Sequence, residues 1–436
     1  MQTSLETLGE LERRLTMSVP VAQIESEIAQ RLARLAKNAK VPGFRPGKVP
    51  LRMVAQQYGP QVRSDVISDA VKTTFADAIR EQNLRIAGYP RIEPKAEAAT
   101  PSVLEFSAEF EVYPEVRIGE LSDITIERPQ TEVGPDDVDR TIEMLRKQRT
   151  RYERVARAAA PGDRAIVDFS GMIDGIAFAG GQASDFSIVL GEGRMLPEFE
   201  AAIAGMMAGE TRTFMLTFPA DYHGKEVAGK EATFTLNLKS VEAGHLPDID
   251  ADFVKAFGIA TGGIDDLKAE ITSNLKLELK RKIDTRVKEQ VFAALRQKAA
   301  FTLPKSLVEI EAQNMAQRMA ADMREQGMKA EDIKLAPEMF RAGAEGRVAL
   351  GLILSEVVRT EGLGAKPDQV KALVQEAAQT YEQPDAVVRW HYEKPERLSD
   401  FEALAVEHNV VAWVLGRAQV QDKAASFTDL MGTART

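Results

Sequence analysis

The N-terminal region contains the stretch Val41-Pro42-Gly43-Phe44-Arg45-Pro46-Gly47-Lys48-Val49-Pro50. Its prolines and glycines predict a stiffened loop, which carries one aromatic ring and two cations. A helical pattern begins at Val21 before the loop, and a second one reaches Phe75 after it. Alternating, strand-like runs lie outside both, at 11–19 and 104–112. Residues 1–112 are therefore expected to form an α+β domain with this loop between two helices.

The loop lies in a segment, 28–64, that contains no aspartate or glutamate. Its basic residues are Arg31, Arg34, Lys37, Lys40, Arg45, Lys48, Arg52 and Arg63. In a chain of net charge -10, positive potential is concentrated here. Such a patch attracts polyanions over a Debye length of about 8 Å, which makes RNA a candidate partner. The alternative is a solvated helix face followed by a tight turn.

The composition indicates a large, mostly helical protein. A chain of 436 residues predicts two to four domains, and 44% hydrophobic residues suffice for real cores. The first residues resemble no signal peptide and no run is long enough to span a membrane, so we expect a cytoplasmic protein without membrane contact. The chain has no cysteine, and its four histidines are scattered, so we expect neither a metal nor a cofactor.

Beyond the first domain, the pattern changes twice. Residues 113–160 read as a linker with one short strand and one helix, and residues 161–246 form a Gly-rich, β-rich module. From 247 to 436 the pattern is helical, with predicted helices at 264–299, 304–327, 337–362, 367–381 and 397–419. The predicted fold class is multidomain α+β, with a small antiparallel sheet and a mainly helical C-terminal domain.

No nucleophile elbow, phosphate loop or nicotinamide fingerprint is present, and Gly191-Glu192-Gly193 reads as a turn. The β-rich module instead gathers aromatic residues in a chain that has only 6% of them. They are Phe169, Phe178, Phe186, Phe199, Tyr222 and Phe234. Periodicity alone leaves two interpretations open, a small core or a small apolar pocket.

The order of motifs in this module resembles the FKBP-type peptidyl-prolyl isomerases. The matching runs are 167–171 (VDFSG), 174–178 (DGIAF), 186–191 (FSIVLG), 195–200 (MLPEFE), 205–210 (GMMAGE), 222–224 (YHG) and 232–236 (ATFTL). The resemblance implies a pocket lined by Phe169, Phe178, Phe186, Met195, Leu196, Phe199, Tyr222 and Phe234. Two departures are Ala179, where the family has an acidic residue, and a short stretch between Tyr222 and Gly229.

An apolar pocket suits this chemistry. Rotation about an X-Pro amide meets a barrier of about 18–20 kcal/mol from lost resonance and breaks no bond. An apolar cage favours the twisted amide, which has lost charge separation, and Tyr222 is positioned to donate a hydrogen bond to the substrate backbone. His223 is interpreted as a surface residue in a turn or as an assisting group.

The whole chain resembles the trigger factor family, bacterial chaperones that meet nascent chains at the ribosomal exit tunnel. Gly43, Phe44, Arg45, Pro46, Gly47 and Lys48 match the family's docking signature. The resemblance implies that this loop contacts a ribosomal protein of the large subunit with rRNA nearby, and that the free protein self-associates. Some members carry a lysine where Pro46 stands, so docking here has one cation fewer.

The resemblance also implies that the helical domain binds nascent and unfolded polypeptides. Met315, Met319 and Met323 step by four along one predicted helix, and such flexible side chains accept many apolar segments. The alternative is that they pack against a neighbouring helix. Two rival functions stay open: a free-standing isomerase that uses its helices as a client platform, and a non-enzymatic assembly chaperone with a closed pocket.

Overall fold

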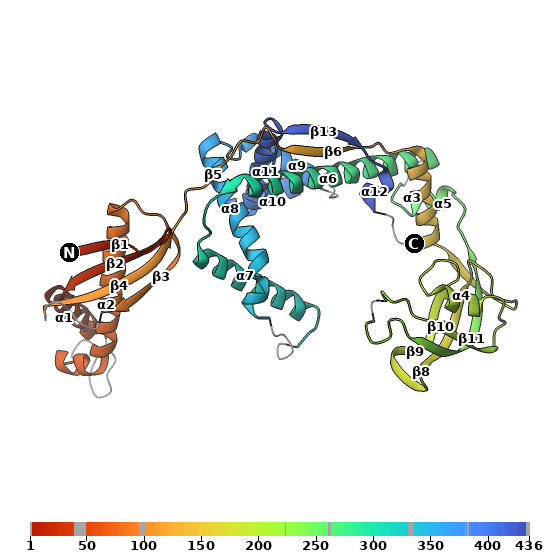
Figure 1. Cartoon of the computed structure of the whole chain (residues 1–436), viewed down its shortest axis with the longest axis horizontal. Coiled ribbons are helices and arrows are strands. Elements are labelled where there is room, and N and C mark those ends of the chain that lie inside the picture. Colours follow the sequence, from red (N-terminus) through yellow and green to blue (C-terminus); the bar gives the residue numbers. More distant parts are fainter. Residues whose placement is uncertain are drawn as a thin grey trace. The chain divides into compact units, whose positions relative to one another are not determined.

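The computed structural model describes residues 2–38, 49–95, 102–222, 224–259, 263–329, 335–379, 381 and 383–432. The chain divides into two compact units (Figure 1). The first comprises Met1–Ile126 with Glu289–Gln419, and the second comprises Glu127–Lys288 with Val420–Thr436. Each unit therefore combines segments that are far apart in the sequence.

The N-terminal part of the first unit is a four-stranded antiparallel sheet with two helices. Its elements are β1 (Gln2–Thr7), β2 (Glu12–Pro20), α1 (Val21–Asn38), α2 (Leu51–Glu81), β3 (Ile86–Pro94) and β4 (Val103–Val112), in sheet order β1-β2-β4-β3. Successive side chains of β2 point to opposite faces of the sheet, so Leu15, Met17 and Val19 are all buried against the helices. This arrangement confirms the predicted α+β class. The loop residues 43–48 lie between α1 and α2, outside the described residues.

The rest of the first unit is mainly helical. Its elements are β5 (Arg117–Ile118), β12 (Ala299–Ala300), α7 (Lys305–Glu325), η2 (Pro337–Phe340), α8 (Arg341–Glu361), α9 (Pro367–Ala378), α10 (Pro384–Tyr392), η3 (Pro395–Leu398) and α11 (Ser399–Leu415). β5 pairs with β12. α7 packs on α8 through Val308, Ala312 and Ala344. The helical class of this region is confirmed.

The N-terminal sheet meets the start of α7 through polar contacts. The Glu111 carboxylate accepts hydrogen bonds from the backbone N–H groups of Lys305 (3.1 Å) and Ser306 (2.7 Å). The Ser306 hydroxyl donates to the Ala87 carbonyl at 2.7 Å. A carboxylate at a helix N-terminus satisfies unpaired N–H groups and complements the helix dipole. Glu111 thus caps α7 from a neighbouring strand.

The second unit holds the β-rich module and a small helical layer. Its elements are β6 (Thr125–Gln130), α3 (Pro135–Gln148), β7 (Arg151–Val155), β8 (Arg164–Ile173), β9 (Ile176–Val189), α4 (Pro197–Ile203), β10 (Thr211–Thr217), β11 (Glu231–His245), α5 (Ala251–Lys255), α6 (Ile264–Lys298, which continues into the first unit), β13 (Gln419–Ala424) and α12 (Phe427–Met431). The main sheet has the order β10-β11-β8-β9, and β7 pairs with β11. The segment 113–160, expected to be a linker, thus contributes a strand to this sheet.

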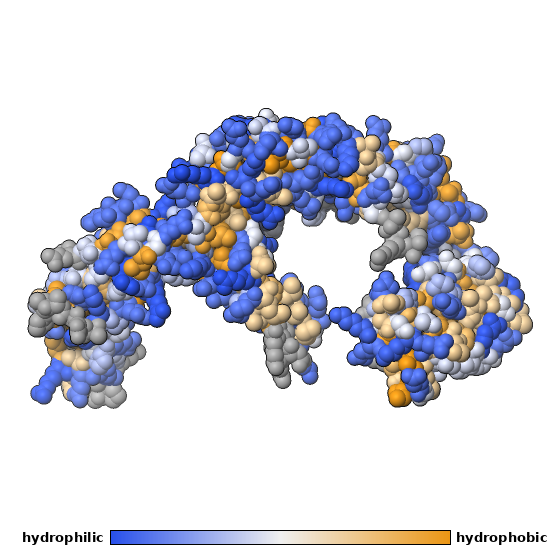
Figure 2. Space-filling model, viewed as in Figure 1, coloured by the Kyte–Doolittle hydropathy of each residue, from blue (hydrophilic) through white to orange (hydrophobic). Residues whose placement is uncertain are grey.

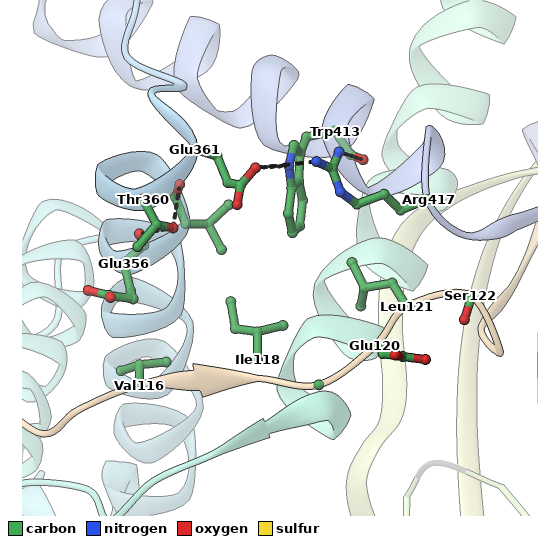
Figure 3. A pocket seen from close by; sticks show the side chains of 12 residues that line it. Val116, Ile118, Glu120, Leu121, Ser122, Glu356, Thr360, Glu361, Trp413 and Arg417 are labelled. Carbon is green, nitrogen blue, oxygen red and sulfur yellow. Dashed lines mark hydrogen bonds and ion pairs between the residues drawn. The ribbon is translucent and has the colours of Figure 1, made fainter.

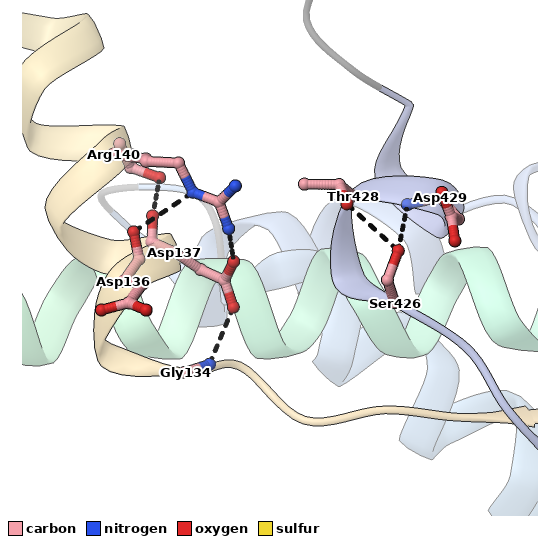
Figure 4. A network of polar contacts seen from close by, with 8 residues as sticks. Gly134, Asp136, Asp137, Arg140, Ser426, Thr428 and Asp429 are labelled. Atoms are coloured by element: carbon pink, nitrogen blue, oxygen red, sulfur yellow. Dashed lines mark hydrogen bonds and ion pairs between the residues drawn. The ribbon is translucent and has the colours of Figure 1, made fainter.

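Side-chain caps fix two helix starts in this unit (Figure 4). The Asp137 carboxylate accepts from the Gly134 backbone N–H at 2.8 Å and pairs with Arg140. The Ser426 hydroxyl accepts from the Asp429 backbone N–H at 3.0 Å. Each cap satisfies an N–H group that the helix leaves unpaired, so α3 and α12 begin at defined residues.

The two-stranded ribbon of β6 and β13 is held by ion pairs. The Asp422 carboxylate accepts from Arg128 (2.7 Å and 3.0 Å) and from the Gln130 amide (3.0 Å). The Arg128 hydrogen bond, followed by that of Gln130, lowers the pKa of Asp422 to about 2. Lys423 pairs with Glu127 at 3.0 Å. The ribbon therefore depends on ionised carboxylates.

We expect the contribution of Asp422 to stability to be lost only in strong acid. A lowered folded-state pKa stabilises the folded form fully above the unfolded pKa, about 3.8. That stability is lost as pH falls from there through about 2. Thermal melts from pH 7 to pH 2 should converge for the parent and Asp422→Asn as acidity increases, with the parent more stable at neutral pH. Parallel curves at every pH would contradict this assignment.

Candidate active site

The β-rich module contains a cavity of about 600 Å³. Its lining includes Phe169, Phe178, Met195, Leu196, Phe199, Tyr222 and Phe234. These are the side chains that the FKBP-type resemblance predicts for a pocket, with the exception of Phe186. The Phe186 ring packs edge-on against Phe169, with centroids 5.6 Å apart, and so supports the wall from behind.

The walls come from elements that the sheet topology brings together. Phe169 lies on β8, Phe178 on β9 and Phe234 on β11, while Phe199 lies on α4, which begins at Pro197. The Phe199 ring is 1% exposed and meets Phe169 edge-to-face at 5.2 Å and Phe234 at 5.7 Å. Edge-to-face contacts of this kind fix ring orientation. Phe199 is therefore the rigid floor of the cavity.

The sequence left two interpretations of these aromatic residues open, a small core and a small apolar pocket. In the structure the rings do both. Phe199 and Phe234 belong to the buried cluster of the module, whereas Phe169, Phe178 and Tyr222 are only partly buried against it. The same side chains line the cavity. Because the same side chains belong to the core and to the cavity wall, periodicity could not distinguish the two interpretations.

Further lining residues were not predicted, among them Leu216, Phe218 and Val227. The Phe218 ring lies 4.9 Å from Tyr222 and 5.9 Å from Phe178, between centroids. The sequence does contain a pattern that could have identified Phe218. Hydrophobic residues occupy positions 214, 216 and 218, and every second residue of a strand lies on the same face. Gly224 and Lys225 extend the lining beside Tyr222. His223 and the side chain of Ala179 lie outside what the structure describes.

The Asp168 carboxylate, which precedes the lining residue Phe169 on β8, is engaged by other groups. Asp168 pairs with Lys239 at 2.9 Å and accepts from the Asp185 backbone N–H at 2.8 Å. The hydrogen bond from Lys239, followed by that from Asp185, lowers the pKa of Asp168. Asp168 thus stays ionised and serves to hold β8 to β9 and β11. The described walls are mainly aromatic and aliphatic, and Arg194, Lys225 and Glu226 also line the cavity. The apolar walls suit rotation about an amide, which breaks no bond.

Gly171 provides a test of how tightly the pocket is packed. A Cβ at this position would lie 2.5 Å from Cε1 of Phe234, a distance that forces the ring to move. We expect Gly171→Ala to lower isomerase kcat/KM by about tenfold, because small displacements of a binding wall are costly. Activity on a proline peptide, measured beside Gly351→Ala, checks this. Gly351 has no atom within 4 Å of such a Cβ, so equal activities would contradict the packing argument.

The predicted docking loop, Gly43 to Lys48, lies outside the described residues, but its flanks are described. Arg31 pairs with Asp69 at 2.9 Å, and Arg63 pairs with Glu25 at 3.4 Å. Among the described cations of segment 28–64, Arg34, Lys37 and Arg52 have no ion-pair partner. Unneutralised charge therefore remains near both ends of the loop.

The predicted methionine stripe on α7 is divided. Met315 packs with Val308, Ala312 and Ala344 against α8, while Met319 is 41% exposed and Met323 is partly exposed. Glu311 beside them pairs with Arg318 (2.8 Å) and Arg347 (3.0 Å). Figure 2 shows that hydrophobic residues on the visible face are broken up by hydrophilic ones. The stripe thus combines a packed end with an accessible one.

Three family models match the chain. They are "Bacterial trigger factor protein (TF)" at residues 1–145, "FKBP-type peptidyl-prolyl cis-trans isomerase" at 155–239, and "Bacterial trigger factor protein (TF) C-terminus" at 263–416. Curated proteins called trigger factor are similar over the full length. Those of Aromatoleum aromaticum and Azoarcus sp. are each 51% identical over 100% of both chains. The chain belongs to the trigger factor family.

This membership confirms the resemblance found in the sequence. A trigger factor of Nitrosospira multiformis is 50% identical over 99% of this chain. A solved structure titled for the trigger factor chaperone is similar over 95% of this chain at 17% identity, with a TM-score of 0.48. The FKBP-type match covers β8, β9, α4 and β10 and the cavity between them. The chain is thus a chaperone of the trigger factor family with a peptidyl-prolyl isomerase domain, which binds ribosomes and nascent chains.

None of the described helices is both long enough and apolar enough to cross a bilayer. Within the same residues, no group of three or more His, Cys, Asp or Glu side chains is arranged to hold a metal ion.

Proposed function

We propose that the aromatic cavity of the second unit is where X-Pro bonds isomerise. The observation that carries this proposal is the convergence of Phe169, Phe178, Phe199, Tyr222 and Phe234 on one cavity of about 600 Å³, within the range typical of ligand pockets. The prolyl ring enters against the Phe199 floor. Aromatic walls replace the water that stabilises the planar, charge-separated amide, and so favour the twisted form.

The proposal assigns Tyr222 an orienting role. Its ring packs against Phe218 at the cavity wall, and its hydroxyl donates a hydrogen bond to a substrate carbonyl. Met195 and Leu196, which precede α4, complete an apolar seat that adapts to the residue before proline. Since rotation breaks no covalent bond, these residues bind and desolvate the amide and transfer no proton.

We assign ribosome contact to the segment Gly43 to Lys48, through Phe44 and the cations Arg45 and Lys48. The aromatic ring supplies shape recognition of a large-subunit ribosomal protein, and the cations reach rRNA phosphates. Arg34 and Lys37 of α1, which have no ion-pair partner among the described residues, add to the positive potential. We also assign the protein to the cytoplasm, partly bound to ribosomes, and, as the family resemblance implies, to a weak homodimer when it is free.

We assign client contact to the accessible end of the α7 stripe, Met319 and Met323, with Met315 supporting it from the α8 interface. Flexible apolar side chains with charged residues between them bind many apolar segments weakly and release them.

The experiment that tests the isomerase proposal is refolding of a protein whose slow phase is set by one X-Pro bond. The chain should accelerate that phase in proportion to its concentration. A non-enzymatic chaperone with a closed pocket would suppress aggregation and leave the rate of the slow phase unchanged.

A further inference from the structure

One wall of the isomerase cavity comes from a turn, residues 191–196, that joins β9 to α4. Four consecutive residues of this turn line the cavity: Gly193, Arg194, Met195 and Leu196. The aromatic residues on the opposing walls lie mostly on strands, whereas the turn contains neither strand nor helix. The shape of the prolyl site therefore depends on a segment that regular secondary structure does not hold.

The turn has few restraints of its own. Gly191 and Gly193 have φ angles of 90° and 67°, in the left-handed region that glycine enters easily. Among the described residues, no backbone-to-backbone hydrogen bond involves positions 192–195. Arg194 pairs with Glu192 at 3.1 Å, but both residues belong to the turn. A restraint from outside the turn is needed to keep these residues at the cavity wall.

Glu200 supplies such a restraint. It lies on α4, directly after the cavity floor Phe199, and does not itself line the cavity. Its Oε2 oxygen accepts a hydrogen bond from the Gly191 backbone N–H at 2.9 Å. A hydrogen bond to a carboxylate is stronger than one between neutral groups. Because α4 also carries Phe199, this bond ties the start of the turn to the floor of the cavity.

The second oxygen of Glu200 shows that this carboxylate is not placed for stability. Among the described residues, Glu200 Oε1 is the one buried side-chain polar atom that lacks a hydrogen-bond partner. Such an atom costs folding free energy. Glu361 of the first unit, by contrast, accepts from the Trp413 indole N–H at 2.8 Å and pairs with Arg417 at 3.3 Å (Figure 3). The bond to Gly191 is thus the main contact through which Glu200 acts.

We infer that Glu200 is a positioning residue of the isomerase site, which holds the turn 191–196 so that Met195 and Leu196 stay against the bound prolyl segment. Without this bond the turn moves relative to the Phe199 floor, and the wall fits the twisted amide less closely. Small displacements of groups that orient a substrate are costly for catalysis. The inference rests on the proposed isomerase function and adds to it a residue outside the cavity lining.

Three substitutions at position 200 test the hydrogen bond in the full-length protein, with activity measured on a proline peptide. Glu200→Ala removes the bond and should lower kcat/KM by about tenfold. Glu200→Asp keeps the charge but shortens the side chain by one methylene, and should lose activity to a similar degree. Glu200→Gln keeps an oxygen that accepts from Gly191 and should stay within about threefold of the parent.

The module offers a matched control at Glu210. Its carboxylate accepts from the Met207 backbone N–H at 3.1 Å, in a turn that does not line the cavity. Glu210→Ala therefore removes a bond of the same kind without touching the site. At a temperature where all variants are folded, it should keep kcat/KM within about threefold of the parent.

Amide hydrogen exchange, followed by mass spectrometry, gives a readout that does not depend on activity. Glu200→Ala should speed exchange in residues 190–196 and leave β8 and β11 unchanged, whereas Glu200→Gln should exchange like the parent. Faster exchange throughout the module would show that Glu200 acts on stability and would overturn the inference.

The kinetic results separate this inference from the function on which it rests. If the parent is active and Glu200→Ala is equally active, or if Glu210→Ala loses as much activity, Glu200 does not position the site. Equal losses in Glu200→Gln and Glu200→Ala would show that the bond to Gly191 is not responsible. If the parent itself does not accelerate isomerisation, the proposed function fails, and this inference fails with it.

Discussion

Phe199→Ala is expected to lower isomerase kcat/KM by about two orders of magnitude, equivalent to about 2.7 kcal/mol of lost transition-state stabilisation. The ring is the buried floor of the cavity and contacts both Phe169 and Phe234. Its removal leaves space that water enters, and water restores the solvation that favours the planar amide. The measurement is catalysis of cis/trans isomerisation in a proline peptide.

The control for this prediction separates catalysis from stability. Phe→Ala and Ile→Ala in a core each cost roughly 2–5 kcal/mol of folding free energy. Ile203→Ala changes a fully buried residue of the same helix that does not line the cavity. At a temperature where both variants are folded, Ile203→Ala should keep kcat/KM within about threefold of the parent. Equal losses in both variants would show that Phe199 acts only through stability.

Simultaneous Phe44→Ala, Arg45→Ala and Lys48→Ala changes are expected to lower ribosome affinity by about 100-fold or more. The variant loses an anchoring ring and two cations. Each lost phosphate contact also reduces the slope of log affinity against log salt by roughly 0.7–0.9. Co-sedimentation with vacant ribosomes across a salt series measures both effects, and isomerase activity should be unchanged.

The chain offers a matched control for the docking variant. Tyr89, Arg91 and Lys95 also combine an exposed ring, 84% accessible, with two cations in the same domain. Their replacement by alanine changes the net charge equally. If this control pellets with ribosomes and the loop variant does not, the loop is the docking site. If all three proteins pellet alike, the loop is not the docking site and ribosome contact lies elsewhere in the chain.

Much of the fold could be predicted because its elements have strong periodic patterns. β4 covers 103–112 where alternation predicted 104–112, and α8 ends at Glu361 immediately before Gly362, which adopts a left-handed conformation. β13 was missed, because its residues are all exposed and show no alternation. Its pairing with β6 depends on contacts such as that of Arg128 with Asp422, which are 294 residues apart in the sequence. Patterns within a short stretch of sequence cannot predict a contact between two residues so far apart.

The candidate site was predicted from the order of motifs more than from physical pattern. Aromatic enrichment pointed to the module, and the FKBP-type resemblance selected the lining residues. Phe218 was missed because no motif contained it, although strand alternation placed it beside Leu216. Phe186 was expected at the wall, but its ring packs edge-on against Phe169 and does not line the cavity.

Two-dimensional exchange spectroscopy of a blocked X-Pro peptide with substoichiometric full-length protein shows whether the aromatic cavity catalyses rotation about X-Pro bonds, because cis and trans signals are observed without a coupled reaction. We expect exchange cross-peaks that grow with parent concentration and nearly vanish with Phe199→Ala. Exchange at the uncatalysed rate in the presence of the parent would show that the cavity is not catalytic.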